Sequence, residues 1–392
     1  MVAKGRRLMA EIQLIATAAF GLEAVVAREL ENLGYTNQQV ENGRVLFAAD
    51  LAAIPRANLW LRSADRVQLL LGEFTARSFD ELFEQTKALS WEDLIPMDGE
   101  FPVQGKSIKS QLHSVPDCQA IVKKAVVERL KQKYKVQWFP ETGPRYSIQV
   151  ALLKDRATLT IDTSGAGLHK RGYRAEAGQA PIKETLAAAL VQLSHWQPQR
   201  LLLDPFCGSG TILIEAALIG DNIAPGLTRR FAAEDWPLLG RAVWQAARSE
   251  ASGAIEDNPL KLQGSDMDEA VIAIARQNAD NAGVADKIHF QRRELAEVRS
   301  SVKYGCLITN PPYGERLGGA TAQLYKEMGK AFAPWDTWSI YVISSEAEFE
   351  RYYGRKADKK RKLYNGRIEC DYYQFIGPPP PRPDRKHKDA RE

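Results

Sequence analysis

Helix and strand patterns alternate through the second half of the chain, and this alternation restricts the possible folds more than any other feature. Strand-type apolar runs cover 200–206, 260–266, 287–293, 306–309 and 339–344, and helix-type runs cover 184–196, 210–220, 269–283 and 322–332. Helices between consecutive strands act as crossovers, which place the strands in a parallel sheet. The sequence therefore predicts an α/β fold with a doubly wound sheet in this half.

The first half has a mixed α+β pattern. Its predicted strands are 12–16, 39–40, 44–48, 67–71, 146–153 and 156–162, and its predicted helices are 22–35, 78–89 and 115–133. The Gly-rich, basic stretch 165–179 separates the two halves. We expect an N-terminal module over 1–60, a second module over 61–165 and a C-terminal domain over 166–376. The polyproline and charged tail, 377–392, is expected to be disordered.

Composition excludes several classes of protein. The net charge of +4, from 53 Lys and Arg against 49 Asp and Glu, permits a nucleic-acid partner without requiring one. The four cysteines are far apart and have no histidine at ligand spacing, so we expect no metal site and a reducing, cytoplasmic environment. The apolar run near the N-terminus is too short to span a membrane and alternates like a strand, so we expect neither a membrane protein nor a secreted one.

A glycine loop follows the first strand of the C-terminal domain. The segment Asp204-Pro205-Phe206-Cys207-Gly208-Ser209-Gly210-Thr211 lies where a strand ends and a helix begins, the position at which open α/β sheets bind ligands. It is not a phosphate-binding Walker loop, since no Gly-Lys-Ser/Thr follows, and Leu213 replaces the third glycine of the dinucleotide fingerprint. The loop is therefore a candidate cofactor site, and an ordinary glycine turn is the alternative.

Two acidic residues follow the next strand. Asp266 ends that strand and is placed to accept hydrogen bonds from ribose hydroxyls, and a cap of the helix that starts at Glu269 is the alternative. Asp268 precedes the following helix, and we interpret it as the cap of that helix.

The sequence Asn310-Pro311-Pro312-Tyr313 directly follows the strand 306–309. Two consecutive prolines hold the backbone extended and remove two donors, so the Asn310 side chain and the Pro311 carbonyl can face one point. Such acceptors suit an amino group, and Tyr313 supplies an aromatic face on which an extruded base could stack. An ordinary loop is the alternative, and the position about 100 residues after the glycine loop on the same predicted sheet weakens it.

Together, Asp204–Thr211 and Asn310–Tyr313 resemble the motif pair of class I S-adenosylmethionine-dependent amino-methyltransferases that act on nucleic acid. Residues 168–174 and 180–186 resemble the joining segment of THUMP-containing RNA methyltransferases, similar to the bacterial 23S rRNA guanine-N2 methyltransferase group. The resemblance covers nearly the whole chain. It implies a ferredoxin-like module over 1–60, a THUMP RNA-binding domain over 61–165 and a Rossmann-like methyltransferase domain over 166–376.

The resemblance also implies roles for individual residues. S-adenosyl-L-methionine would be the cofactor, and the residues that would contact it are Pro181, Asp204, Phe206, Gly208, Gly210, Thr211, Asp266 and Glu294. Of these, Asp266 would hold the ribose. Glu294 stands where relatives usually have an aspartate that contacts the adenine amino group, so its role is in doubt. The stretch between Ala217 and Asn258 resembles an insertion of this subgroup. The catalytic residues would be Asn310, Pro311, Pro312 and Tyr313.

RNA contact is expected along the joining segment, where cations alternate with an aromatic residue at Lys170, Arg171, Tyr173 and Arg174. A second basic cluster covers Arg355, Lys356 and 359–362, and we interpret it as a solvated charged surface. The THUMP resemblance adds four candidate lysines, Lys106, Lys109, Lys123 and Lys124.

The sequence thus predicts a methyltransferase that forms N2-methylguanosine in 23S rRNA, free or in a ribosomal assembly intermediate. N6-methylation of adenine in rRNA or DNA, and guanine-N2 methylation of tRNA, are alternatives within the same chemistry. A non-catalytic RNA-binding assembly factor is the alternative from another class. Methylation of cytosine C5 would need a cysteine nucleophile, and Cys207 and Cys306 are interpreted as packing residues.

Overall fold

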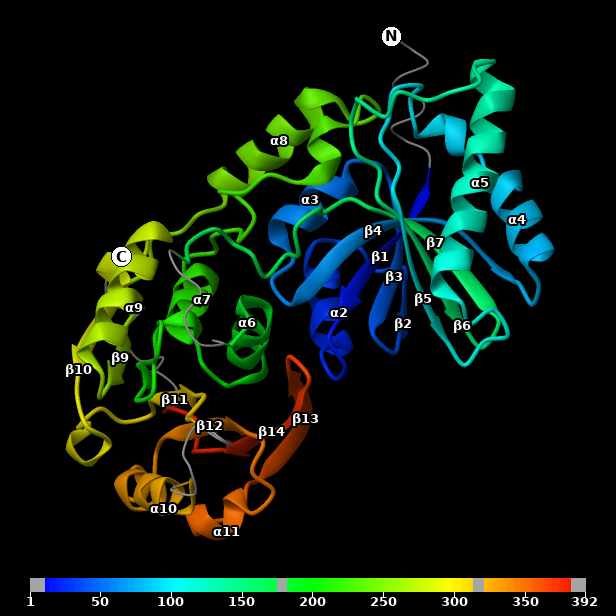
Figure 1. Cartoon of the computed structure of the whole chain (residues 1–392). Coiled ribbons are helices and arrows are strands. Elements are labelled where there is room, and N and C mark those ends of the chain that lie inside the picture. Colours follow the sequence, from blue (N-terminus) through cyan, green and yellow to red (C-terminus); the bar gives the residue numbers. More distant parts are fainter. Residues whose placement is uncertain (1–10, 175–181, 313–320, 382–392) are drawn as a thin grey trace. The chain divides into compact units, whose positions relative to one another are not determined.

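The structure is a computed structural model that describes residues 11–174, 182–312 and 321–381. The chain forms two compact units (Figure 1). Unit 1 comprises Met1–Arg171 and Asn222–Ile255, and unit 2 comprises Gly172–Asp221 and Glu256–Glu392. Part of the predicted tail, 382–392, lies outside the described residues. In the described part of the chain, no helix is both long and apolar enough to cross a membrane.

Unit 1 contains one seven-stranded sheet in the order β2-β3-β1-β4-β7-β6-β5. Neighbouring strands are antiparallel except β5 and β6, which are parallel. The long strand β4 pairs with β1 on one side and β7 on the other, so the sheet runs through both modules expected from the sequence. The strands are β1 (Ile12–Ala18), β2 (Gln38–Glu41), β3 (Arg44–Ala49), β4 (Ala64–Thr75), β5 (Val103–Ile108), β6 (Ile148–Leu153) and β7 (Arg156–Asp162).

Local sequence explains several of these elements. The two-residue turn between β6 and β7 has positive φ at both Lys154 and Asp155, the conformation that favours a tight hairpin. Ser78 caps the helix that follows it, since its side chain accepts a hydrogen bond from the Glu81 amide at 3.2 Å. The helices of unit 1 are α2 (Glu23–Asn32), α3 (Ala53–Trp60), α4 (Phe79–Ala88), α5 (Val115–Tyr134) and α8 (Gly240–Gly253), with short 3₁₀ turns at Trp91–Asp93 and Ala232–Asp235.

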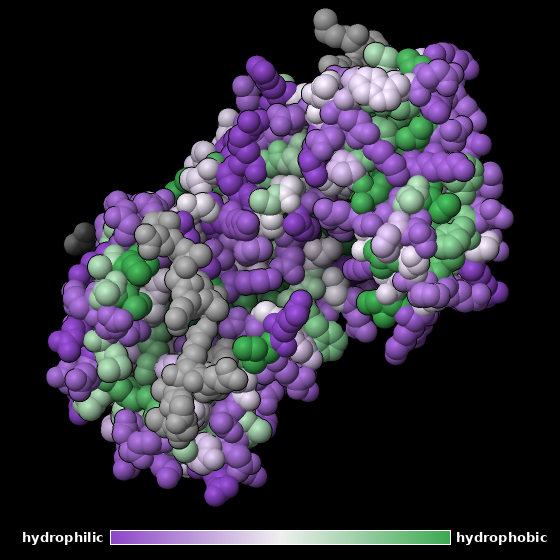
Figure 2. All heavy atoms as spheres, viewed as in Figure 1, coloured by the Kyte–Doolittle hydropathy of each residue, from purple (hydrophilic) through white to green (hydrophobic). Residues whose placement is uncertain are grey.

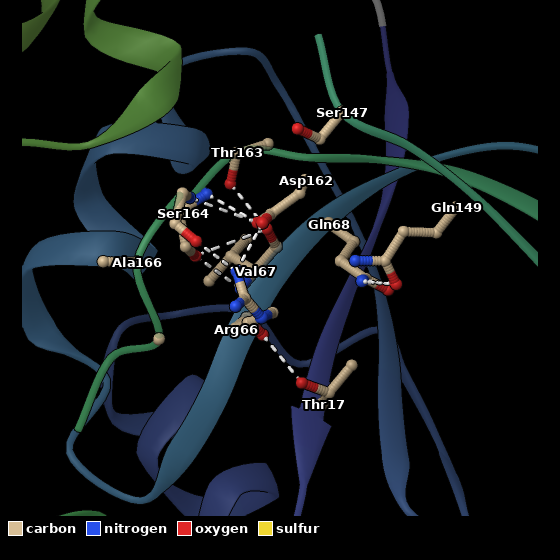
Figure 3. Close-up of polar contacts among 12 residues, drawn as sticks. Thr17, Arg66, Val67, Gln68, Ser147, Gln149, Asp162, Thr163, Ser164 and Ala166 are labelled. Carbon is tan, nitrogen blue, oxygen red and sulfur yellow. Dashed lines mark hydrogen bonds and ion pairs between the residues drawn. The ribbon is translucent and has the colours of Figure 1, made fainter. Parts of the chain in front are cut away.

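Alternation along the strands divides the sheet into two faces. Every second residue, such as Leu14 in β1 and Leu159 in β7, lies in the apolar core of unit 1. Several intervening positions are polar, and Gln68 of β4 donates to Gln149 of β6 at 2.7 Å (Figure 3). At the edge of this polar face, Arg66 contacts Asp162.

The insertion between Ala217 and Asn258 contributes to the core of unit 1. Trp236 stacks on Tyr146 with ring centroids 4.8 Å apart and donates to the Arg145 carbonyl at 3.0 Å. Trp244 of α8 stacks on Phe231 with centroids 5.4 Å apart. The insertion expected from the sequence is therefore a structural part of the other unit.

Unit 2 contains a second seven-stranded sheet, in the order β10-β9-β8-β11-β12-β14-β13. The first five of these strands are parallel, and β14 and β13 add an antiparallel hairpin at one edge. This is the doubly wound, Rossmann-like arrangement expected from the alternation. The strands are β8 (Leu202–Asp204), β9 (Leu262–Asp266), β10 (Ile288–Arg292), β11 (Cys306–Thr309), β12 (Ser339–Ser344), β13 (Lys359–Asn365) and β14 (Ile368–Phe375).

Helices cover both faces of this sheet (Figure 1). One face packs against α10 and α11 through an aromatic cluster that includes Tyr325, Phe349 and Tyr373. On the other face, Tyr372 donates to the Leu190 carbonyl of α6 at 2.9 Å. The helices are α6 (Glu184–Leu193), α7 (Thr211–Gly220), α9 (Glu269–Asn281), α10 (Thr321–Phe332) and α11 (Phe349–Tyr353), with 3₁₀ turns at Ala285–Lys287 and Leu295–Glu297.

Candidate active site

The two motifs singled out in the sequence follow two adjacent strands. β8 and β11 pair in parallel, with Leu202 opposite Cys306 and Leu203 opposite Leu307. From β8 the chain continues to β9 and β10 on one side, and it then returns to β11 on the other side. The carboxyl ends of β8 and β11 therefore flank the topological switch point, where sheets of this class bind ligands.

A hydrogen bond joins the ends of these two strands. Thr309, the last residue of β11, donates from its hydroxyl to Asp204 Oδ1 at 2.6 Å, and the Phe206 amide donates to the same oxygen at 3.1 Å. Asp204 is 2% exposed. Burial raises the pKa of Asp204 to about 7, the nearby charge of Asp266 adds to the rise, and the two hydrogen bonds oppose it. This carboxyl therefore changes charge near neutral pH.

Three hydrogen bonds to β9 and α9 hold the glycine loop. The Cys207 amide donates to the Ser265 carbonyl at 2.9 Å, and the Asn278 side chain of α9 donates to the Ser209 carbonyl at 3.0 Å. The Gly208 amide donates to Asp266 Oδ2 at 3.1 Å. The loop backbone is thus fixed against β9 and α9 before any ligand binds.

The two glycines of the loop face different surroundings. Gly210 has φ +80°, and a Cβ there would lie 2.8 Å from the Phe290 ring, so its hydrogen permits close packing of the loop on β10. Gly208 has φ +52°, and a Cβ there would meet no atom within 4 Å of the protein. Gly208 therefore borders open space beside Asp266.

Arg174, one of the residues predicted to contact RNA, has protein partners at this loop. Its guanidinium donates to the Thr211 hydroxyl at 2.9 Å and to the Ile182 carbonyl, and it pairs with Glu184 at 3.2 Å. Arg174 thereby links the first residue of α7 to the start of α6. The Ser209 and Thr211 hydroxyls lie 3.2 Å apart.

The two acidic residues after β9 have different environments. Asp268 accepts from the Ala270 amide at 2.9 Å and caps α9, which confirms the interpretation from the sequence. Asp266 is partly exposed, and its two oxygens accept from the Gly208 and Asp268 amides. Its role at a ribose stays a prediction.

Asn310 lies directly after Thr309 and so beside Asp204. Its side-chain oxygen, Oδ1, is buried and accepts no hydrogen bond from any residue that the structure describes. A buried acceptor without a donor costs free energy, typically about 1–3 kcal/mol, so this oxygen is free to accept a hydrogen bond from a water molecule or a ligand. Pro311 is buried and Pro312 is partly exposed, while Tyr313 lies outside the described residues.

The surroundings of the other predicted cofactor residues, Phe206, Glu294 and Pro181, do not test contact with a cofactor. Phe206 is partly buried against the aromatic cluster of α10 and α11. Glu294 is exposed, and it forms a reciprocal capping box with Glu297 at the 3₁₀ turn Leu295–Glu297. Pro181 lies outside the described residues. Contact of these residues with a cofactor stays a prediction.

The remaining residues expected to contact RNA differ in exposure. Lys170 is exposed. Arg171 is 3% exposed and donates to the Leu168 and Arg62 carbonyls, and Tyr173 is 4% exposed and donates to Glu215 at 3.1 Å. In this conformation only Lys170 of these three has its side chain on the surface, and a role in RNA binding stays a prediction for all of them.

The remaining candidate groups are potential metal ligands and the cysteines near the site. No group of three or more His, Cys, Asp or Glu side chains in that part of the chain is arranged to hold a metal ion. Cys207 and Cys306 are buried free thiols, and burial raises the pKa of both, to about 12 for Cys306. Their burial agrees with the packing role inferred from the sequence.

Sequence analysis missed three parts of the site. Thr309 was read only as the end of a strand, although its hydroxyl reaches Asp204. Asn278 has no sequence signal, because nothing in a helix pattern shows which polar residue faces a loop. The β13–β14 hairpin had a signal that was not used, the Asn365-Gly366 pair between the segments that form the two strands.

Family models match three segments of the chain. Residues 171–374 match an RMKL-like methyltransferase domain, residues 13–68 match an RlmL ferredoxin-like domain, and residues 76–162 match a THUMP domain. The chain is 55% identical to a Bacillus subtilis protein named "Putative RNA methyltransferase YpsC", over 96% of this chain and 99% of that protein. It is 37% identical to the ribosomal RNA large subunit methyltransferase K/L of Shewanella amazonensis over 91% of its own residues, but it spans only 52% of that longer protein.

Three solved structures superpose on nearly the whole chain. A Listeria monocytogenes protein, described as a predicted N6-adenine-specific DNA methylase, superposes with a TM-score of 0.91 at 55% identity, over 96% of this chain and 98% of that one. SMU.472, described as "a putative methyltransferase complexed with SAH", superposes with a TM-score of 0.90 at 48% identity, over 94% of this chain and 99% of that one. TrmN from Thermus thermophilus shares the fold, with a TM-score of 0.68 at 21% identity over 93% of this chain and 99% of that one.

Proposed function

Because the chain belongs to the family of RMKL-like methyltransferases and carries an RlmL-type ferredoxin-like domain and a THUMP domain, we propose that it methylates the exocyclic N2 amine of a guanine in 23S rRNA. S-adenosylmethionine is the methyl donor of this family. The proposed domains are 1–60, 61–165 and 166–376, followed by the tail 377–392. We place the enzyme in the cytoplasm, where it would act on free rRNA or on an assembling ribosomal particle.

The observation that carries the proposal is the buried Asn310 Oδ1 without a donor, next to the switch point. An exocyclic amine has two N–H donors and is a poor nucleophile, because its lone pair is delocalised into the ring. Hydrogen bonds from this amine to Asn310 Oδ1 and to the Pro311 carbonyl would favour a tetrahedral nitrogen. The lone pair would then point at the methyl group, and the rate would come from positioning and electrostatics.

The residues around the glycine loop fit the methyl donor. S-adenosylmethionine carries a sulfonium and an ammonium group, and it supplies an electrophilic methyl to the amine. Asp204 and Asp266 provide negative charge at this edge of the sheet, and Gly208 leaves open space beside Asp266. We propose that Asp204, Phe206, Gly208 and Gly210 hold the methionine part and Asp266 the ribose. Thr211 and Pro181 would lie beside the cofactor, and Glu294 stands at the position that would contact the adenine amino group.

The target is the less specific part of the proposal. The named relatives include an rRNA methyltransferase and a protein described as an N6-adenine DNA methylase, and Asn-Pro-Pro-Tyr suits either amine. The THUMP match favours RNA over DNA. The chain spans about half of the K/L enzymes, so the activity of those larger proteins extends to this chain only as part of this proposal.

The test of function compares nucleosides from RNA. rRNA and tRNA from a deletion strain are digested and analysed by mass spectrometry, and we expect loss of one N2-methylguanosine from 23S rRNA that purified enzyme restores. Loss of N6-methyladenosine, or of a tRNA methyl group, would assign the alternative target. No restored methyl group in any RNA would contradict enzymatic activity and favour an assembly factor.

The test of mechanism is Asn310→Ala. We expect single-turnover methyl transfer to fall by about 10²–10³, since one positioned partner of the reacting group is removed, while S-adenosylmethionine binding stays within about twofold. Asn37→Ala removes an exposed amide in unit 1 and serves as the matched control. Methyl transfer by Asn310→Ala at the wild-type rate would refute the assignment.

A further inference from the structure

The β13–β14 hairpin extends beyond the catalytic edge of the unit 2 sheet. Thr309, where β11 ends, is level with Val342, and Ser344, where β12 ends, is level with Asp371 of β14. β14 runs antiparallel to β12, so its residues before Asp371 continue past that edge. The hairpin appears as the orange and red pair of strands in Figure 1.

The register gives the approximate position of the hairpin tip. Ile368, the first residue of β14, is three residues beyond Asp371, which corresponds to about 10 Å along the strand. β14 lies two strand spacings from β11, which is also about 10 Å. Val342 pairs with both Thr309 and Tyr373, so Ile368 lies five residues, about 17 Å along the strand, beyond the level of Thr309. The tip therefore lies beside and above the end of β11, where it can contact RNA that flanks the nucleotide in the active site.

The charge of the hairpin is strongly positive. Residues 359–371 carry five Lys and Arg and two Asp and Glu, a net charge of +3, whereas the whole chain has +4. Part of this charge has a structural explanation. Lysines on an edge strand prevent pairing with other chains, and Lys360 and Lys362 also pair with Glu350 and Glu369.

Neither edge protection nor ion pairing explains the exposed residues at the tip of the hairpin. Arg367 is exposed, and it has no acidic side chain within 4 Å among the residues that the structure describes. The next residue, Ile368, is 50% exposed. Gly366 has φ +67° and forms a tight two-residue turn that holds this cation and this aliphatic side chain outward. A cation beside an exposed apolar group matches the phosphate and the base face of an unpaired nucleotide.

We propose that the tip of this hairpin, Arg367 and Ile368, binds the single-stranded RNA that flanks the methylated nucleotide. Arg367 contacts a phosphate, and Ile368 packs on the adjacent base after the target base leaves the stack. This site rests on the proposed function, because it requires RNA as the substrate. It differs from the joining segment and the N-terminal domains, where RNA contact was expected from the sequence.

The experiment uses the full-length enzyme and two probes, a short fluorescein-labelled single-stranded RNA and deproteinised rRNA from a deletion strain. The variants are Arg367→Ala, Ile368→Ala and their double substitution, with Arg367→Lys as the conservative variant. The matched control is Lys303→Ala, because Lys303 is an exposed cation before β11, at the opposite edge of the same sheet.

We expect the double substitution to raise the dissociation constant for the labelled RNA about tenfold. The slope of the logarithm of the binding constant against the logarithm of the salt concentration should become less negative by about 0.7. This is the change expected for loss of one phosphate contact on a single strand. With rRNA, KM should rise while kcat and S-adenosylmethionine affinity stay unchanged. Arg367→Lys should restore most of the affinity, and Lys303→Ala should resemble the wild type.

The outcomes separate this site from the function on which it rests. If the wild type methylates rRNA and the tip variants equal Lys303→Ala in affinity, salt slope and KM, the hairpin site is refuted and the enzymatic proposal stands. If the wild type neither binds nor methylates rRNA, both are refuted. An unchanged salt slope with Arg367→Ala would refute the phosphate contact even where affinity falls.

Discussion

Asp204 is a buried carboxyl whose charge depends on its neighbours. Burial raises its pKa from 3.8 to about 7, and the Thr309 hydroxyl holds it lower than burial alone would. In the free protein this carboxyl binds a proton in the folded state that it loses in the unfolded state between about pH 4 and 7. Its contribution to stability is therefore present below about pH 4 and is lost as the pH rises through about 7.

In the free protein, burial favours the protonated carboxyl of Asp204. Cofactor binding should favour the ionised carboxyl instead, because S-adenosylmethionine carries positive groups. We expect the affinity for S-adenosylmethionine to rise as the pH increases through about 7, with release of a proton. Thr309→Val should raise the pKa of Asp204 further, because it removes a hydrogen bond to the ionised form, and should move the midpoint to higher pH. Calorimetry in buffers of different ionisation enthalpy measures both effects.

Two variants control this prediction. Asp204→Asn should bind more weakly and with no pH dependence near neutrality. Thr337→Val removes a hydroxyl that accepts from the Tyr304 amide, at the opposite edge of the sheet, and should leave the midpoint unchanged. A midpoint that does not move in Thr309→Val would contradict the role of this hydrogen bond.

At the scale of residues, the sequence located candidate site residues better than it predicted which side chains they contact. Asp204 and Asn310 stood out because motifs contain them, and Asp268 was recognised by its place before a helix. Arg174 was expected on an RNA surface, yet its guanidinium contacts Thr211 and Glu184. Exposure and hydrogen-bond partners depend on the packing of distant segments, and a run of cations in the sequence does not contain that information.

The glycine loop is the element on which the cofactor site depends. Its two glycines have positive φ for different reasons, since Gly210 packs against Phe290 and Gly208 borders open space. Substitutions at these positions should therefore affect different properties of the protein.

We expect Gly210→Ala to destabilise the fold by about 1–3 kcal/mol, because the new methyl group collides with Phe290 and φ is strained. Gly208→Ala should cost about 1 kcal/mol of stability from its φ alone, but should weaken S-adenosylmethionine binding at least tenfold by filling the open space. Thermal unfolding and calorimetry separate the two effects. Equal losses of stability and of affinity in both variants would contradict the distinction.

Element prediction succeeded where one periodicity dominated. Apart from α8, the main strands and helices from 184 to 344 were found because buried parallel strands and amphipathic helices alternate there. The helices α3, α8 and α11 and the strands β5, β13 and β14 were missed. β5, with the sequence Val-Gln-Gly-Lys-Ser-Ile, is largely polar and contains a glycine, and its place is set by parallel pairing with β6. Long-range pairing of this kind leaves little trace in a local pattern.

At the scale of the molecule, unit 1 is built from two separate stretches of chain. The segment Asn222–Ile255 supplies Phe231, Trp236 and Trp244 to its core. The sequence suggested an insertion there, but could not indicate what the insertion packs on. The two seven-stranded sheets agree with the predicted fold classes, while the domain boundaries themselves stay predictions.

This arrangement predicts the behaviour of fragments. A fragment of residues 11–171 lacks Trp236 and Trp244, and loss of one buried tryptophan typically costs about 3–5 kcal/mol. We expect it to unfold without a cooperative transition and to bind a hydrophobic dye. The matched control joins 11–171 to 222–255 through a flexible Gly-Ser linker and should unfold cooperatively. Cooperative unfolding of both fragments at the same temperature would contradict the structural role of the insertion.

The divided unit 1 also restricts how enzymes of this type acquire new targets in evolution. A single gene fusion that exchanged residues 1–171 would leave Trp236 facing a foreign surface in place of Tyr146. The core of unit 1 in the exchanged protein would then contain surfaces that do not fit each other. Recombination between lineages at this junction should therefore lower the stability of the product. New specificity should therefore arise mainly by point substitution on exposed surfaces, and a successful chimera should require both segments from one parent.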